Sequence, residues 1–189
     1  MNLDHPFKTQ AHDLPALLEG CVKLSTFCTR LEKQAQLHPD RYDPDKYKGD
    51  GFELFVEALI KLSPVDNRIG IGDYQVVTEG DVGVDGFGTG ANGKPATVQV
   101  KYRGKTDSVL TANGDHLSNF LNASTFRYNV AVDEDKSNRL IITTAKGLHR
   151  FTESEMLHDK VRYLGHEELR QIVDNNILFW DNFRSLALD

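Results

Sequence analysis

A glycine-rich stretch near the middle of the chain separates two kinds of α/β protein. Residues 88–94, GTGANGK, fit the G-x-x-x-x-G-K core of a phosphate-binding loop. Such a loop needs a Ser or Thr directly after the lysine and a helix behind it. Here Pro95 follows the lysine, and residues 96–102 alternate in the manner of a β-strand. We therefore interpret the stretch as the loop of a β-hairpin that turns at Asn92-Gly93, and not as a nucleotide site.

Composition places the chain among ordinary globular proteins. Its 189 residues suffice for one domain with its own core, at 39% hydrophobic and 26% charged residues. We see no apolar run near the ~18 residues of a membrane span and no secretory signal. Cys21 and Cys28 lie on one face of an expected helix, so no disulfide is expected between them. We expect a cytoplasmic protein (host cytoplasm if phage-encoded) without a membrane partner.

Hydrophobic periodicity and turn residues predict an alternating order of helices and strands. The expected helices cover 14–37, 50–62 (with Asp50 as N-cap), 115–128, 151–159 and 165–176. The expected strands cover 74–77, 82–87, 96–102, 138–145 and 161–164. A linker over 38–51 precedes the second helix, and an aromatic tail over 177–183 either packs on the last helix or joins a further domain. This order predicts an α/β domain with a central sheet.

Polar side chains of the hairpin and of the preceding helix are expected to meet at one end of that sheet. Gln99 and Lys101 are two residues apart, so they share a face of their strand. Asp85 lies on the partner strand, and the second helix can bring Glu53 or Glu57 over the same edge. Carboxylates with an amide oxygen suit a hard cation such as Mg²⁺. With His and Cys absent from this cluster, zinc is not expected.

Five short motifs occur in order along the chain: GDGFE (49–53), GDVGVDG (80–86), VQVKYR (98–103), LIITTAKGLHRFTESE (140–155) and LGHEEL (164–169). Together they resemble the motifs of the PD-(D/E)XK nuclease superfamily, and within it the Mrr-like restriction endonucleases. The resemblance implies a restriction-endonuclease-like central mixed β-sheet flanked by helices. The implied nuclease domain covers 46–189, and residues 1–45 form an N-terminal helical extension and linker.

The resemblance also implies roles for individual residues. Glu53, Asp85 and Gln99 are expected to surround the metal ion, with the Val100 carbonyl as an additional ligand and Lys101 as the catalytic lysine. Many superfamily members carry an acidic residue where this chain has Gln99. A neutral amide leaves the site one charge short, so phosphate oxygens and waters must supply more of the coordination.

Further residues are candidates for supporting roles. Glu57 and Asp81 are expected either to be solvated or to lie next to the metal ligands. Several basic residues are candidates for contacts to DNA phosphates, although scattered basic residues usually belong to a solvated surface. These are Arg103, Lys105, Arg127, Lys146 and Arg150.

The implied function is a Mg²⁺-dependent DNA endonuclease of restriction or phage DNA-processing type, in which Mn²⁺ can substitute. A metal-activated water would leave a 5′-phosphate and a 3′-hydroxyl. Two alternatives stay open: a structure-selective nuclease of the Holliday-junction type, and a catalytically inactive nucleic-acid-binding module of a larger helicase or restriction assembly. A homodimer, and a longer chain with a helicase or recognition domain, are open as well. A net charge of −6 excludes neither function, because binding depends on local fields.

Overall fold

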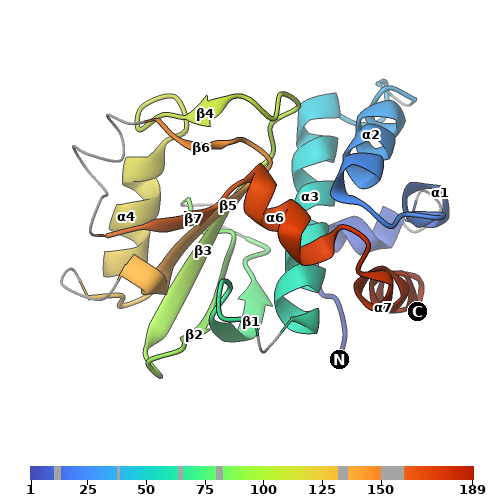
Figure 1. Ribbon diagram of the computed structural model, residues 1–189. Helices are drawn as coiled ribbons and strands as arrows, with labels where there is room; N and C mark the ends of the chain where they lie inside the picture. The colour runs from blue at the N-terminus through green and yellow to red at the C-terminus, as the bar shows by residue number, and fades with distance from the viewer. Residues whose placement is uncertain (11–13, 38, 64–65, 80–82, 132–135, 150–159) are drawn as a thin grey trace.

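The computed structural model describes residues 1–10, 14–37, 39–63, 66–79, 83–131, 136–149 and 160–189. Within them, a five-stranded sheet has the order β1-β2-β3-β5-β7 (Figure 1). Its strands are β1 (Ile71–Val76), β2 (Gly86–Gly90), β3 (Pro95–Lys101), β5 (Arg139–Thr143) and β7 (Arg162–Leu164). Pairing is antiparallel for β1/β2 and β2/β3, and parallel for β3/β5 and β5/β7. The predicted α/β class with a mixed central sheet is confirmed.

Helices flank this sheet. They are α1 (Leu14–Leu18), α2 (Leu24–Ala35), α3 (Pro44–Leu62), α4 (Leu117–Phe126), α6 (His166–Val173) and α7 (Ile177–Leu188), with 3₁₀ turns η1 (Pro6–Gln10) and η2 (Lys136–Asn138). Strands β4 (Val109–Leu110) and β6 (Gly147–Leu148) form a small parallel pair. In Figure 1, α4 lies on one side of the sheet, and α3 with α1, α2 and α7 lies on the other. The predicted helix 151–159 falls outside the described residues.

The predicted hairpin forms, but its glycines have another role than expected. The turn is tight, with the Gly93 N–H donating to the Gly90 carbonyl at 2.9 Å and φ +76° at Gly93. Gly88 and Gly90, which were expected in the loop, belong to β2, so the first hairpin strand lies four residues later than predicted. A Cβ at Gly88 would overlap the carbonyl oxygen of Gly72 in β1. Here glycine serves the close approach of two strands.

Two helix predictions need correction. The helix expected over 14–37 is broken into α1 and α2, because Gly20 takes a left-handed φ of +59° between them. Helix α3 begins at Pro44 and not at residue 50, so part of the expected linker is helical. Its N-cap is Asp43, whose carboxylate accepts the Lys46 N–H at 2.8 Å. Asp50 therefore lies within the helix, where its carboxylate contacts the Lys46 ammonium at 2.9 Å.

Strand β3 separates two apolar layers. Val98 and Val100 belong to the larger core cluster, which includes buried residues of α3. On the opposite face, the Thr97 hydroxyl contacts the Ser124 hydroxyl of α4 at 2.8 Å. Alternation along the strand therefore directs Gln99 and Lys101 to the α4 side. Residues before position 46, among them Leu3, Phe7, Leu14, Leu18, Leu24 and Leu31, share the larger core with the sheet.

The expected aromatic tail is the first part of α7, and it closes the larger core. Trp180 is fully buried, and its indole N–H donates to the Val173 carbonyl at 2.8 Å. Its ring lies 6.0 Å from that of Phe55 in α3 and 6.2 Å from that of Phe27 in α2. Helix α7 thereby ties the N-terminal helices to α3. None of the helices in the described ranges is long and apolar enough to cross a membrane.

Replacing Trp180 with Ala is expected to destabilise the protein by about 3–5 kcal/mol, since it leaves a cavity where three helices meet. Urea unfolding followed by circular dichroism measures the change. Leu178→Ala on the same helix is the matched control, because Leu178 is 71% exposed and its loss should cost under about 0.5 kcal/mol. Equal losses for both variants would contradict the packing described for α7.

Candidate functional site

Two neighbouring cavities lie between α3 and the ends of β2 and β3, and Glu53 lines both. The first, here called the acidic pocket, has a volume of about 230 Å³. Its lining includes His5, Lys46, Asp50, Glu53, Val84 and Asp85. The second, here called the lysine pocket, has a volume of about 470 Å³. Its lining includes Lys48, Glu53, Val100, Lys101 and Arg103. Four of the residues predicted from sequence, Glu53, Asp85, Val100 and Lys101, thus border adjoining cavities.

Asp85 is held against β3 by its own backbone and side chain. Its N–H donates to the Val98 carbonyl at 2.9 Å, and its carboxylate accepts the Val100 N–H at 2.6 Å. The side chain thereby extends the hydrogen bonding along β3 to a point where β2 has not yet begun. The two hydrogen bonds of Asp85 go to the residues on either side of Gln99. Gly83, two residues earlier, has a positive φ of +86°. A Cβ on this residue would lie only 3.0 Å from the backbone nitrogen of Phe120 in α4, so glycine allows the chain to pass close to this helix. Close contact with α4 brings Asp85 to the sheet end.

Gln99 is buried within β3, with only 1% of its surface exposed. Its Oε1 atom has no hydrogen-bond partner among the described residues. Burying a hydrogen-bond acceptor without a partner costs free energy, so such an atom commonly binds a water or an ion. The residues that line the two pockets do not include Gln99.

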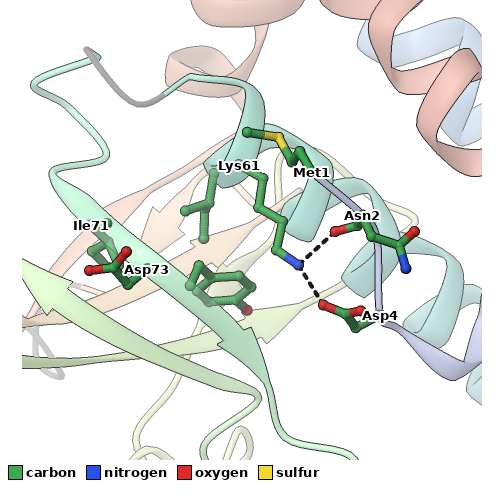
Figure 2. A pocket seen from close by; sticks show the side chains of 9 residues that line it. Met1, Asn2, Asp4, Lys61, Ile71 and Asp73 are labelled. Atoms are coloured by element: carbon green, nitrogen blue, oxygen red, sulfur yellow. Dashed lines mark hydrogen bonds and ion pairs between the residues drawn. The ribbon is translucent and has the colours of Figure 1, made fainter.

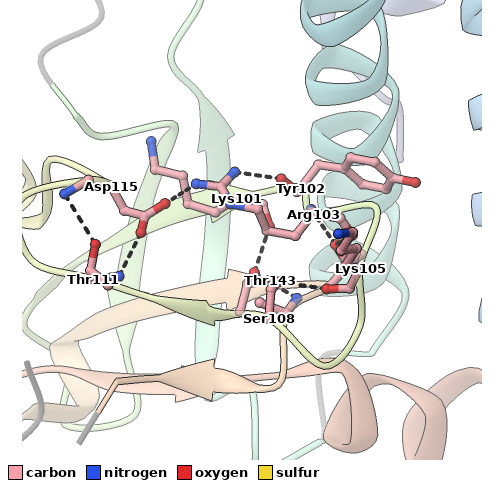
Figure 3. A network of polar contacts seen from close by, with 11 residues as sticks. Lys101, Tyr102, Arg103, Lys105, Ser108, Thr111, Asp115 and Thr143 are labelled. Atoms are coloured by element: carbon pink, nitrogen blue, oxygen red, sulfur yellow. Dashed lines mark hydrogen bonds and ion pairs between the residues drawn. The ribbon is translucent and has the colours of Figure 1, made fainter.

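Lys101 ends β3 with its backbone fixed and its ammonium uncommitted. Its carbonyl accepts the Thr143 hydroxyl at 2.7 Å and the Thr144 N–H at 3.3 Å. Within the described part of the chain, the Lys101 ammonium makes no hydrogen bond or ion pair, and no dashed line reaches it in Figure 3. An ammonium without an internal partner is available to an anion at this end of the sheet.

The electrostatics of Tyr74 show that the carboxylates of the site act on one region. Burial raises the pKa of the Tyr74 phenol well above its ordinary value, and the negative charges of Asp85, Glu53 and Glu57 raise it further. The three carboxylates come from α3 and from the residue before β2. Their shared effect on one ring indicates that they produce a common negative potential.

The donor set fits a hard divalent cation. Glu53 and Asp85 line one cavity, Val100 lines the next, and the buried Gln99 amide oxygen has no partner among the described residues. Oxygen ligands of this kind, with room left for water, suit Mg²⁺ or Mn²⁺. The residue types therefore fit such an ion.

The structure also brings in residues that sequence reasoning missed. Ligand atoms of His5, Asp50 and Glu53 lie within 4.8 Å of one another. The expectation that no histidine joins the cluster was wrong, because His5 contacts Glu53 at 2.8 Å across 48 positions of sequence. No spacing pattern could have revealed this contact, since it depends on how the N-terminal segment crosses α3. Asp50 was singled out in the sequence, but only as the expected N-cap of the helix and not as a member of the site.

Glu57, one turn after Glu53, holds that N-terminal segment. Its carboxylate is fully buried and accepts the N–H groups of Asp4 at 2.7 Å and His5 at 3.0 Å. It also contacts the Lys61 ammonium at 2.6 Å. Burial opposes the charged state of Lys61, but hydrogen bonds to Asp4 and Glu57 raise its pKa overall. Figure 2 shows Lys61 reaching both Asn2 and Asp4 in a further cavity beside β1.

The basic residues named from sequence differ in their surroundings. Arg103 forms an ion pair with the buried Asp115 and donates to the Tyr102 carbonyl at 2.6 Å (Figure 3). Lys105, Arg127 and Lys146 are exposed. Asp81 and Arg150 lie outside the described residues. Arg103 thus has a partner inside the fold, which leaves the exposed three as surface cations.

Comparison of the chain with protein-family models, with curated proteins and with solved structures found no match. The function is therefore inferred from the residues and their geometry.

Replacing Glu57 with Ala should destabilise the protein by about 3–5 kcal/mol, because two backbone N–H groups and Lys61 lose a buried acceptor. Urea unfolding gives the free energy, and hydrogen exchange at the Asp4 and His5 amides should accelerate. Asp45→Ala is the control, since Asp45 pairs with Lys48 at the surface and is 92% exposed. Its removal should leave the urea midpoint nearly unchanged. Unchanged exchange at residues 4 and 5 in Glu57→Ala would contradict the anchoring role.

Proposed function

We propose that this chain is a Mg²⁺-dependent DNA endonuclease of the PD-(D/E)XK type, whose motifs resemble those of the Mrr-like branch. The observation that carries the proposal is the joint placement of Glu53 and Asp85 on one cavity, with Lys101 on the cavity beside it. The mixed sheet with helices on both sides supports the restriction-endonuclease-like fold that goes with this activity.

Each residue has a role that its surroundings support. Glu53 and Asp85 would bind the cation through carboxylate oxygens, and Gln99 and the Val100 carbonyl would add neutral oxygens. When bound, the cation polarises the scissile phosphate and lowers the pKa of a water. Lys101 would orient the attacking water and offset negative charge that develops on the phosphate oxygens. The products are a 5′-phosphate and a 3′-hydroxyl.

The two faces of the sheet must meet for these roles to combine. Glu53 comes from the α3 side, whereas Gln99 and Lys101 leave β3 on the α4 side. The acidic pocket bridges the two sides, because its lining includes Val84, which belongs to the core cluster against α4. We therefore place the proposed ion in the acidic pocket, which Glu53, Val84 and Asp85 line.

Purified protein with Mg²⁺ is expected to nick supercoiled plasmid DNA. Asp85→Asn and Lys101→Ala should each slow nicking roughly 100-fold or more, since each removes a group that acts in the transition state. Gel quantification of supercoiled, nicked and linear DNA gives the rates. Lys94→Ala in the hairpin turn is the matched lysine control and should leave the rate unchanged.

Two results would count against this function. DNA binding without cleavage in either Mg²⁺ or Mn²⁺ would point to a binding module without catalysis. Cleavage that survives Asp85→Asn would come from another site or from a contaminant. Substituting a synthetic four-way junction for the plasmid in the same assay tests the structure-selective alternative.

A further inference from the structure

Residues 4–7 are fixed on α3 by both backbone and side-chain contacts. The N–H groups of Asp4 and His5 both donate to the buried Glu57 carboxylate. Phe7 is 1% exposed and meets the ring of Tyr47 edge-on at a centroid distance of 4.9 Å. His5 lies between these anchors and is itself only 6% exposed. Its imidazole is therefore held in one place relative to α3.

Both ring nitrogens of His5 have defined partners. The Phe7 N–H donates to His5 Nδ1 at 3.0 Å, so Nδ1 presents a lone pair. In a neutral imidazole with Nδ1 as acceptor, the proton is on Nε2. Nε2 lies 2.8 Å from Glu53 Oε2 and therefore donates its hydrogen to that carboxylate. The backbone of Phe7 thus selects the tautomer that holds Glu53.

This assignment decides between two roles for His5. Its Nε2 is close enough to Asp50 and Glu53 for a shared ion, but a nitrogen that carries a hydrogen has no lone pair to give to a metal. The hydrogen bond instead restrains Oε2 of Glu53. The other oxygen, Oε1, has no hydrogen-bond partner in the described ranges, so it is available to a cation in the acidic pocket.

We infer that His5 is a positioning residue, which orients the Glu53 carboxylate for the divalent cation without itself binding the metal. The inference rests on the proposed function, since it concerns the same ion. It makes the N-terminal segment part of the site: Glu57 anchors the backbone, Phe7 sets the tautomer, and His5 restrains Glu53. It also keeps the ligand set free of nitrogen, which suits Mg²⁺ and Mn²⁺ over Zn²⁺.

A matched pair of substitutions separates the two hydrogen bonds of the ring. His5→Gln keeps an N–H donor near the position of Nε2, whereas His5→Asn keeps an acceptor near Nδ1 and loses the donor to Glu53. Mn²⁺ affinity of the full chain, measured from the electron paramagnetic resonance signal of free Mn²⁺, reports the site without any DNA. His5→Asn should weaken binding by about 10- to 100-fold, and His5→Gln should restore most of it. Lys8→Ala should have no effect, because Lys8, half-buried in the same segment, bonds Asn2 and not Glu53.

A double-mutant cycle distinguishes positioning from a general loss of structure. If His5 acts through Glu53, then His5→Asn should weaken Mn²⁺ binding no further in a protein that already carries Glu53→Gln. Full additivity would overturn the inference, because it would mean that His5 affects the ion by another route. Thermal melting of each variant identifies any loss of Mn²⁺ binding that comes from unfolding. If His5→Asn is unfolded, the comparison of His5→Gln with Lys8→Ala tests the inference instead.

The outcomes also separate this inference from the proposed function. Wild-type affinity in His5→Asn, while Asp85→Asn abolishes both Mn²⁺ binding and nicking, would overturn the role of His5 and leave the nuclease intact. Weakened binding in His5→Asn with rescue in His5→Gln, but no nicking by the wild type, would support the role of His5 and remove the nuclease. Absence of Mn²⁺ binding in the wild type would overturn both.

Discussion

The hydrogen bond from the Val100 N–H to the Asp85 carboxylate connects the fold to the site. At this point the backbone of β2 has not yet joined the sheet, and the side chain of Asp85 takes its place in the ladder at 2.6 Å. The carboxylate is therefore positioned by the same register that positions Lys101, one residue further along β3. A charged group held by a strand is placed more accurately than one held by a loop. Through this bond, the geometry of the site follows from the pairing of the hairpin.

Helix α3 supplies the second half of the site and uses two glutamates one turn apart in different ways. Glu57 is fully buried, and its three contacts are all internal to the protein. Glu53 is partly exposed and lines two cavities, and among the described residues its hydrogen-bond partner is the imidazole of His5, through Oε2. Burial and partners thus divide the pair into a structural carboxylate and one that remains available to an ion. The structural one holds the segment that restrains the other.

Local pattern was sufficient to predict much of the fold. Alternation and β-branching predicted β3 and the hairpin, and helical periodicity predicted the buried face of α3. The errors came from interactions that the pattern does not contain. Gly20 breaks a continuous apolar periodicity through a single left-handed residue. Gly88 looks like a loop residue until β1 is seen packed against it. For the candidate site, spacing along strand and helix predicted that Asp85 and Lys101 lie near Glu53 or Glu57, but it did not include His5, which enters through a contact over 48 positions.

The central claim is that Glu53 and Asp85, from a helix and from the start of a strand, share one divalent cation. Anomalous diffraction from crystals soaked in Mn²⁺ tests it most directly, because the ion is then located without reference to activity. The account predicts one strong anomalous peak in the acidic pocket, within bonding distance of an oxygen of each of these two residues. A peak that contacts only one of them, or no peak there at all, would contradict it.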